Sequence, residues 1–437
     1  MTRFPLMALV LSAAASSPGA AAAEQRVLTL DEALRAARAH HPQLAAARAE
    51  TEAKTAKVNV ARAPLLPQVT GSASYQRATR HAMVTAVPTS GSMPITTAGT
   101  ASSNLYSVGL GVSQLLYDFG QTTGKWNAAK ATLQSQEQAE RNLAVEVAFN
   151  VRAAFHAAAA AAALVKVAVD NLANQELHLR QIQGFVEAGT RPEIDLAQAR
   201  TDRANAQVQL INAQVGFDSA KAALNQAIGV EGTTEFDVAD PGAVAVEGEG
   251  EEIDTLMGAA LRARPDLQSL QRQIEAQEFV TSGLRGGYAP TLSANAGLTE
   301  SGPALDDLNW GFRAMLSLNW QLFGGGVTDA QVREARASLA VLRAQYDLQR
   351  QQMRLELEQA RLGVRAAKAS VDAAREAAVN ARVRLTLAEG RYQAGVGNVI
   401  ELGDAQVAFA SAAAQEVQAR FNLATARAKL LLALGRP

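Results

Sequence analysis

Apolar and polar residues alternate with a period of two in several segments, and this pattern predicts β-strands. The clearest example sets one apolar series against a more polar one: Trp310, Phe312, Ala314, Leu316, Leu318 and Trp320 against Gly311, Arg313, Met315, Ser317, Asn319 and Gln321. Further strand-like segments lie at 68–77 and 105–117. Half of a soluble sandwich shows the same period, but about ten residues per strand with aromatic ends favour a membrane barrel.

A helical pattern covers most of the remaining chain. An amphipathic helix is predicted from about Asp31 to Arg62, and no proline occurs between 122 and 188 or between 328 and 394. Each of these two segments is about 66 residues long, which corresponds to about 100 Å of helix. Apolar residues recur every seven positions, as in Leu172, Leu179 and Val186, which predicts coiled-coil packing. Both long helices end at a glycine and are followed by a return helix of about 35 residues.

The chain is a tandem repeat of one unit. A shift of 206 residues carries "GFVEAGTRPEIDL" (184–196) onto "GRYQAGVGNVIEL" (390–402), and the match runs without a gap from 112–229 to 318–435. The front of each unit matches at a shift of 223, which places Pro42 on Pro265 and Pro67 on Pro290. The 17 extra residues of the first copy fall between 76 and 111, where a stretch rich in Ser, Thr, Gly and Pro predicts a long surface loop.

The predicted organisation follows from the repeat. Residues 1–23 have the features of a secretory signal peptide, with Arg3, an apolar run and Ala21-Ala22-Ala23 before Glu24. The first helix–strand–loop–strand–helix repeat spans 24–229, a linker spans 230–252, and the second repeat spans 253–437. Within them, 68–117 and 290–323 hold the strands and external loops, and the rest is helical.

Composition excludes several classes of function. The chain has no cysteine, which rules out disulfides, thiolate metal sites and an acylated cysteine anchor. The net charge of −1 shows no excess of basic residues of the kind that binds nucleic acid. Five histidines are scattered without a metal-binding spacing, and no catalytic constellation is found, so we expect neither an enzyme nor a cofactor or metal site. After the signal peptide no run of 18 apolar residues occurs, so entry into a membrane would require strands.

The number of predicted strands requires more than one chain. Four strands are too few to close a barrel, and an open sheet in hydrocarbon leaves its edge N–H and C=O groups unsatisfied. Three copies would supply twelve strands.

The signal peptide, the duplicated unit, the prolines at 67 and 290 and the "AGTRPEIDL" and "AGVGNVIEL" turns together resemble the TolC-like outer-membrane efflux protein family. The resemblance implies a mixed fold, with long coiled-coil hairpins forming a periplasmic α-barrel and four strands contributed to a trimeric transmembrane β-barrel. The linker at 230–252 would then lie in the equatorial region.

In function the resemblance implies a passive exit duct in the bacterial outer membrane, extending into the periplasm and surrounded by outer-membrane lipid. Its partners would be a periplasmic adaptor and an inner-membrane pump of the RND or ABC type, exporting drugs, metals or other small molecules. An outer-membrane component of type I protein secretion is an alternative within the family, and a non-conducting structural envelope stalk is an alternative of another class. Polar strand residues such as Arg313 favour a duct over a stalk.

The resemblance also implies roles for residues near the two helical turns. Tyr392 and Asp195 occupy the positions of a tyrosine–aspartate hydrogen bond that latches the entrance closed. An arginine that reinforces this latch in the family is replaced by Gly397, and we expect Arg191 to compensate.

Two acidic residues and the turns complete the expected site. Glu401 and Asp404 lie three apart on one helix face, which is typical of a solvated surface, but the family places acidic residues there in a ring around the periplasmic entrance. The turns at 189–192 and 395–398 are the tips of the hairpins. The residues expected to contact the adaptor are Gly189, Thr190, Gly395 and Val396.

Overall fold

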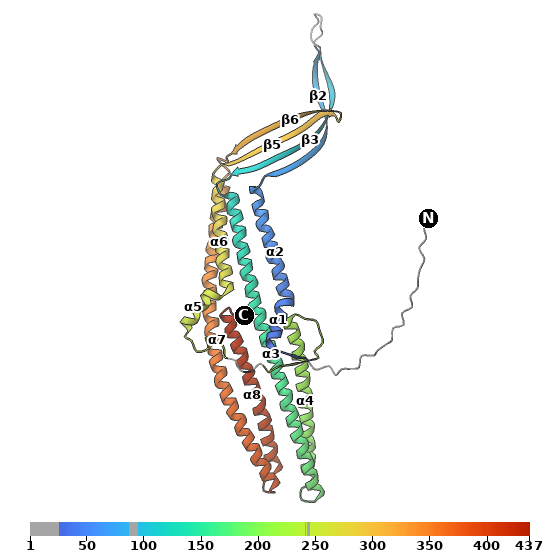
Figure 1. The fold of residues 1–437 in the computed structure, drawn as a ribbon, viewed down its shortest axis with the longest axis vertical. Helices are drawn as coiled ribbons and strands as arrows, with labels where there is room; N and C mark the ends of the chain where they lie inside the picture. Colours follow the sequence, from blue (N-terminus) through green and yellow to red (C-terminus); the bar gives the residue numbers. More distant parts are fainter. Residues whose placement is uncertain (1–25, 87–94, 241, 243–244) are drawn as a thin grey trace, which may run out of the picture. The chain divides into compact units, whose positions relative to one another are not determined.

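The computed structural model of the chain describes residues 26–86, 95–240, 242 and 245–437, so the predicted signal peptide at 1–23 lies outside the described residues. The elements follow the same order in both halves (Figure 1). The first half contains α1 (Leu30–His40), α2 (Pro42–Arg62), β2 (Gln68–Ala86), β3 (Ile95–Tyr117), α3 (Gln121–Glu187) and α4 (Glu193–Ile228). The second contains α5 (Ile253–Ala263), α6 (Pro265–Arg285), β5 (Thr291–Ala304), β6 (Asp307–Asn319), α7 (Val327–Gln393) and α8 (Val399–Ala433). Two short strands, β1 (Arg26–Leu28) and β4 (Phe236–Val238), pair in parallel.

The two halves match closely in the length of their helices. Helices α3 and α7 each contain 67 residues, α2 and α6 each contain 21, and α1 and α5 each contain 11. Helix α3 also contains a stretch that is long and apolar enough to cross a membrane by length and composition alone. That stretch includes the run of alanines at 157–163, a composition that equally suits close packing of helices.

The helix predicted from 31 to 62 is in fact two helices, and the break has a local cause. His41 has an extended conformation (ψ 122°) because the proline that follows disfavours the helical region at this residue. Arg264, which precedes Pro265, has the same conformation (ψ 118°) and separates α5 from α6. Helix α1 begins with a capping box, in which Thr29 and Glu32 each accept a hydrogen bond from the other's backbone N–H.

The four longer strands form one antiparallel sheet in the order β2-β3-β5-β6. The register sets apolar residues opposite each other, as in Leu110 beside Leu298 and Leu298 beside Phe312. The apolar face is exposed in the single chain, with Phe312 at 67% and Leu316 at 66%. The sheet therefore has the two-faced pattern predicted from the sequence.

The predicted long surface loop is largely wrong. Strands β2 and β3 continue as a paired hairpin as far as Ala86 and Ile95, and only 87–94 lie outside the described residues. The 17 additional residues of the first repeat mainly lengthen this hairpin. Threonines and serines on both strands are compatible with pairing even though they also mark turns.

The strand-to-helix junction uses consecutive residues in the left-handed region. In the first half these are Phe119 (φ 52°) and Gly120 (φ 90°), and Asp118 accepts a hydrogen bond from the N–H of Thr122 at 2.6 Å. In the second half the same conformation falls on Gly325 and Gly326. The glycines at the two junctions are thus explained by backbone geometry.

The chain divides into two compact units, and each combines segments of both repeats. One contains 150–245 and 366–425, and thus the four helix segments next to the turns; the other contains 42–149 and 246–365, and thus the four-stranded sheet. The repeat boundaries at 229 and 253 stay a prediction.

Candidate functional site

The two turns that join α3 to α4 and α7 to α8 have the same hydrogen-bonded geometry. Gly189 (φ 71°) and Gly395 (φ 77°) adopt the left-handed conformation. The N–H of Thr190 donates to the carbonyl of Phe185 at 2.9 Å, and the N–H of Val396 donates to that of Arg391 at 3.1 Å. These are Schellman turns, which require a residue that tolerates a positive φ.

All four residues predicted to contact an adaptor are exposed. Gly189, Thr190, Gly395 and Val396 lie in the turns themselves, and the side chain of Val396 is 71% exposed. The geometry therefore leaves them accessible.

The two return helices begin differently. The side chain of Asn398 accepts a hydrogen bond from the N–H of Glu401 at 2.7 Å and caps the start of α8. Pro192 occupies the corresponding position before α4 and provides no side-chain cap. Glu193 and Asp195 in the first turn of α4 place negative charge at the positive end of the helix dipole.

Tyr392 is the largest side chain in the core of this region. It is 2% exposed and belongs to a buried cluster with Ile182, Ala199, Leu385, Ala388, Leu402 and Ala405, which come from α3, α4, α7 and α8. Edge-on ring contacts join it to His178 at 5.4 Å and Phe185 at 6.4 Å between centroids. The cluster holds the ends of the two hairpins together.

Arg191 is also in contact with Tyr392. Its guanidinium lies 4.7 Å from the centre of the phenol ring, a cation–π arrangement, and it donates a hydrogen bond to the carbonyl of Gly397 at 3.3 Å. Gly397 is buried, and a Cβ at this position would lie 2.9 Å from the N atom of Tyr392. A side chain at 397 is therefore disfavoured by space, and the arginine of this region comes from the first turn instead.

The hydrogen bond expected between Tyr392 and Asp195 is not formed in the structure. The hydroxyl of Tyr392 is buried and has no hydrogen-bond partner among the described residues. Burial raises the pKa of Tyr392, the charge of Arg191 lowers it, and the charge of Asp195 raises it. Asp195, itself buried, is thus close enough to act on the phenol electrostatically.

The two acidic residues of the predicted ring have different surroundings. Glu401 forms an ion pair with Arg391 at 3.4 Å, and both side chains are about half exposed. Asp404 lies one turn further along α8 and is exposed. The ion pair offsets part of the negative charge that the sequence assigns to this face.

His178 is one of the five scattered histidines of the sequence, and the structure buries it against Tyr392. Burial lowers its pKa, while the charge of Asp202 and a hydrogen bond with Gln181 act in the opposite direction. The available signal was its spacing from Ile182 and Phe185, four and seven residues later on one face of α3.

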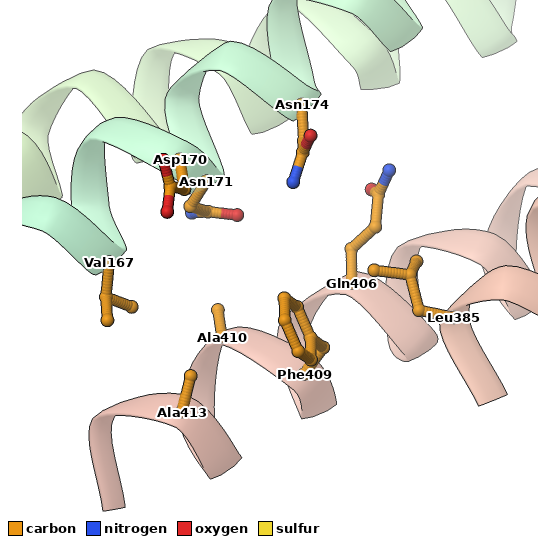
Figure 2. Close-up of a pocket in the computed structure, with 9 residues that line it drawn as sticks. All are labelled: Val167, Asp170, Asn171, Asn174, Leu385, Gln406, Phe409, Ala410 and Ala413. Atoms are coloured by element: carbon orange, nitrogen blue, oxygen red, sulfur yellow. The ribbon is translucent and has the colours of Figure 1, made fainter. Parts of the chain in front are cut away.

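A small pocket of about 70 Å³ lies between α3 and α8 and shares Leu385 with this cluster (Figure 2). Asp170, Asn171 and Asn174 line it from α3, while Gln406, Phe409, Ala410 and Ala413 line it from α8. Beside it, the amide of Gln175 donates to Gln406 at 3.0 Å, and both side chains are buried. Among the described residues no group of three or more His, Cys, Asp or Glu side chains is placed to hold a metal.

Long antiparallel hairpins and a four-stranded sheet with an exposed apolar face define the class of outer-membrane channel subunits built from a duplicated unit. The family model described as outer membrane efflux protein matches residues 33–230 and 256–436. The chain belongs to the outer membrane efflux protein family, which confirms the predicted recognition, fold class and outer-membrane location.

Individual relatives agree with this assignment. The outer membrane efflux protein BepC of Brucella suis biovar 1 (strain 1330) is 25% identical over 73% of this chain and 66% of the relative. The antibiotic efflux pump outer membrane protein ArpC of Pseudomonas putida is 25% identical over 88% of this chain and 78% of the relative. The crystal structure of the CmeC outer membrane channel of Campylobacter jejuni has the same fold, with a TM-score of 0.80, 18% identity, and coverage of 98% of this chain and 93% of that one.

Proposed function

We propose that three copies of this chain form an outer-membrane exit duct for a tripartite efflux pump. One observation carries the proposal: the sheet β2-β3-β5-β6 has unpaired outer edges at β2 and β6 among the described residues and an exposed apolar face. Such edges are tolerated in a membrane only when other strands complete a closed barrel. Twelve strands from three copies leave an aqueous lumen, which four or eight do not.

The duct is passive, because an efflux protein of this family has to obtain its energy from a partner. We propose that an inner-membrane pump and a periplasmic adaptor supply it and that the chain catalyses no reaction. Relatives are named for the efflux of toluene, solvents and antibiotics, which supports small molecules as the cargo.

Planar-bilayer recording and mass measurement of the purified oligomer in detergent test this function together. The proposal expects a trimer that conducts ions in discrete steps. A folded monomer, or a trimer without conductance, contradicts the duct, and the second result would support a structural stalk. Export of a protein cargo but no small molecule in cells would instead support type I secretion.

We further propose that Arg191 and Tyr392 form the latch of the entrance in this protein. Arg191 follows the turn of the first hairpin and lies on Tyr392 of the second, so the pair links the two hairpins. Removal of either side chain frees the hairpins to separate. Asp195 contributes through its charge.

Glu401 and Asp404 are proposed to make the entrance selective for cations. Three copies would bring six carboxylates towards the axis, although the pairing of Glu401 with Arg391 weakens half of them. The reversal potential of the double variant Glu401→Gln, Asp404→Asn should move towards the value of a pore that does not select between cations and anions. A matched change away from the turns, Glu416→Gln, should leave the reversal potential unchanged, and equal shifts in both variants would contradict the assignment.

The turns are proposed as the docking site for the adaptor. Val396→Trp adds bulk at an exposed position without a positive φ, so it should block transport while trimer mass and conductance are retained. Val396→Leu is the control, which should transport normally. Full transport by the tryptophan variant would remove this turn from the docking site.

A further inference from the structure

The cleft between α3 and α4 differs from its counterpart in the second repeat. Arg180 of α3 and Arg200 and Arg203 of α4 line it together with Leu179 and Glu176. Glu176 pairs with Arg203 at 3.4 Å, while Arg180 and Arg200 are exposed and have no ion pair among the described residues. Three arginines and one glutamate leave the cleft strongly basic.

The repeat relates this cleft to the pocket in Figure 2. The shift of 206 residues carries Leu179, Arg200 and Arg203 of the cleft onto Leu385, Gln406 and Phe409 of the pocket. Besides Leu385 of α7 and the residues of α8, the pocket has a third wall, formed by Val167, Asp170, Asn171 and Asn174 of α3. The basic cleft lacks this wall in the single chain.

The residues that would form the missing wall can be read from the same shift. It carries Val167, Asp170, Asn171 and Asn174 onto Ala373, Glu376, Ala377 and Asn380 of α7, and all four are exposed. In a closed ring of duplicated subunits, the contact of α8 with α3 inside one chain repeats as a contact of α4 with α7 of the next chain. This contact would bring the carboxylate of Glu376 to the arginines of the cleft.

Apolar exposure on α4 supports the same partner. Val208, Ile211 and Val215 are 56%, 51% and 59% exposed. The residues at the matching positions of α8, Ala414, Val417 and Phe421, are each partly buried. An exposed stripe of this kind beside a basic cleft indicates a covered face in the assembly.

We propose that the basic cleft is an interface between copies of this chain, completed by α7 of the next copy, with Glu376 of that copy facing Arg200 and Arg203. The inference rests on the proposed trimer and adds the residues that join its subunits. Within one chain the return helix α8 presents the neutral Gln406 and Phe409 to Asp170 of α3, at the positions where α4 has Arg200 and Arg203. The ring would therefore alternate between contacts with a neutral return helix within chains and contacts with a basic return helix between chains.

Crosslinking between introduced cysteines tests the placement of α7 of the next copy on the cleft. The native chain contains no cysteine that could react in their place. Arg200→Cys with Ala381→Cys reproduces the positions of Gln406 and Gln175 across the interface between copies. A short bifunctional thiol reagent should join these chains into species of two and three times the chain mass. Gln406→Cys with Gln175→Cys is the control, which should crosslink within one chain and leave the mass unchanged.

Charge exchange tests the chemistry. Arg200→Glu and Glu376→Arg should each lower the temperature at which the trimer dissociates in detergent, and the double variant should recover most of the loss. Asp170→Arg, at the counterpart of Glu376 in the first repeat, should not rescue Arg200→Glu.

The outcomes separate this inference from the proposed function. A trimer in which the control pair crosslinks but the Arg200–Ala381 pair does not would overturn the interface and leave the duct standing. Reaction of the cysteine at position 200 with a bulky thiol reagent in the intact trimer would also overturn the interface. The cleft would then be open to a partner other than a second copy of this chain. A monomer would overturn both proposals.

Discussion

The most informative substitutions concern Tyr392, because removal of its hydroxyl and removal of its ring should have opposite effects. The hydroxyl makes no hydrogen bond among the described residues, so Tyr392→Phe loses no bond and relieves a buried polar group. Such a group costs about 1–3 kcal/mol, which sets the upper limit of the stabilisation. Tyr392→Ala instead empties the centre of the cluster and should cost about 3–5 kcal/mol of local stability.

Arg191→Ala provides the matched comparison. It removes a cation–π contact worth about 0.5–2 kcal/mol and a long hydrogen bond to the carbonyl of Gly397. Because Arg191 is partly exposed, we expect a total of about 2 kcal/mol, which corresponds to about a thirtyfold rise in the population of separated tips.

The expected loss of local stability thus increases from Tyr392→Phe through Arg191→Ala to Tyr392→Ala, and two measurements check this order. Amide hydrogen exchange at 185–202 and 388–402 should slow or stay unchanged in Tyr392→Phe, and should accelerate in Arg191→Ala and most in Tyr392→Ala. Single-channel conductance should rise in the same order. If Tyr392→Phe conducts as much as Arg191→Ala, the hydroxyl contributes a bond in the assembled protein, and the reasoning from its unpaired state is refuted.

Three further predictions concern other positions. Because the pKa of His178 is lowered by burial, folding loses stability as the pH falls below about 6.5, and His178→Gln should flatten this dependence in thermal melts between about pH 7.5 and 5. Asn398→Ala should cost about 1 kcal/mol through loss of the α8 cap, seen as faster exchange at the start of α8. Gly124→Ala should destabilise the protein because its Cβ would lie 2.7 Å from the Cα of Gly283, whereas Gly216→Ala, with open space around it, should stabilise α4 by up to about 1 kcal/mol. Equal shifts in melting temperature for Gly124→Ala and Gly216→Ala would contradict the close approach of the backbone at Gly124.

Much of the fold could be predicted from the sequence because its signals are periodic. The duplicated order of elements, the strand faces and the glycine turns follow from apolar spacing and from residues such as Gly189 and Gly395, whose conformation few other residues tolerate. Two local predictions were wrong. A proline broke the first helix at His41, and strands β2 and β3 extended through a stretch of small polar residues that also suits a loop.

The candidate site was less predictable because it depends on contacts between the two repeats. The sequence indicated Tyr392, Asp195 and Arg191 through a family resemblance, but not that Arg191 would lie on the ring while the phenol stays unpaired among the described residues. The burial of His178 against Tyr392 requires knowledge of how α3 packs on α7. Spacing along one helix does not contain that information.

The equal length of α3 and α7 restricts how this protein can change during evolution. Each has 67 residues, and one inserted residue would move its turn by about 1.5 Å and rotate it by about 100° relative to the other. The contact between Arg191 and Tyr392 would not survive such a displacement. Insertions and deletions should therefore be tolerated in whole heptads and in both repeats together, so that the helical hairpins can lengthen only in steps of about 10 Å.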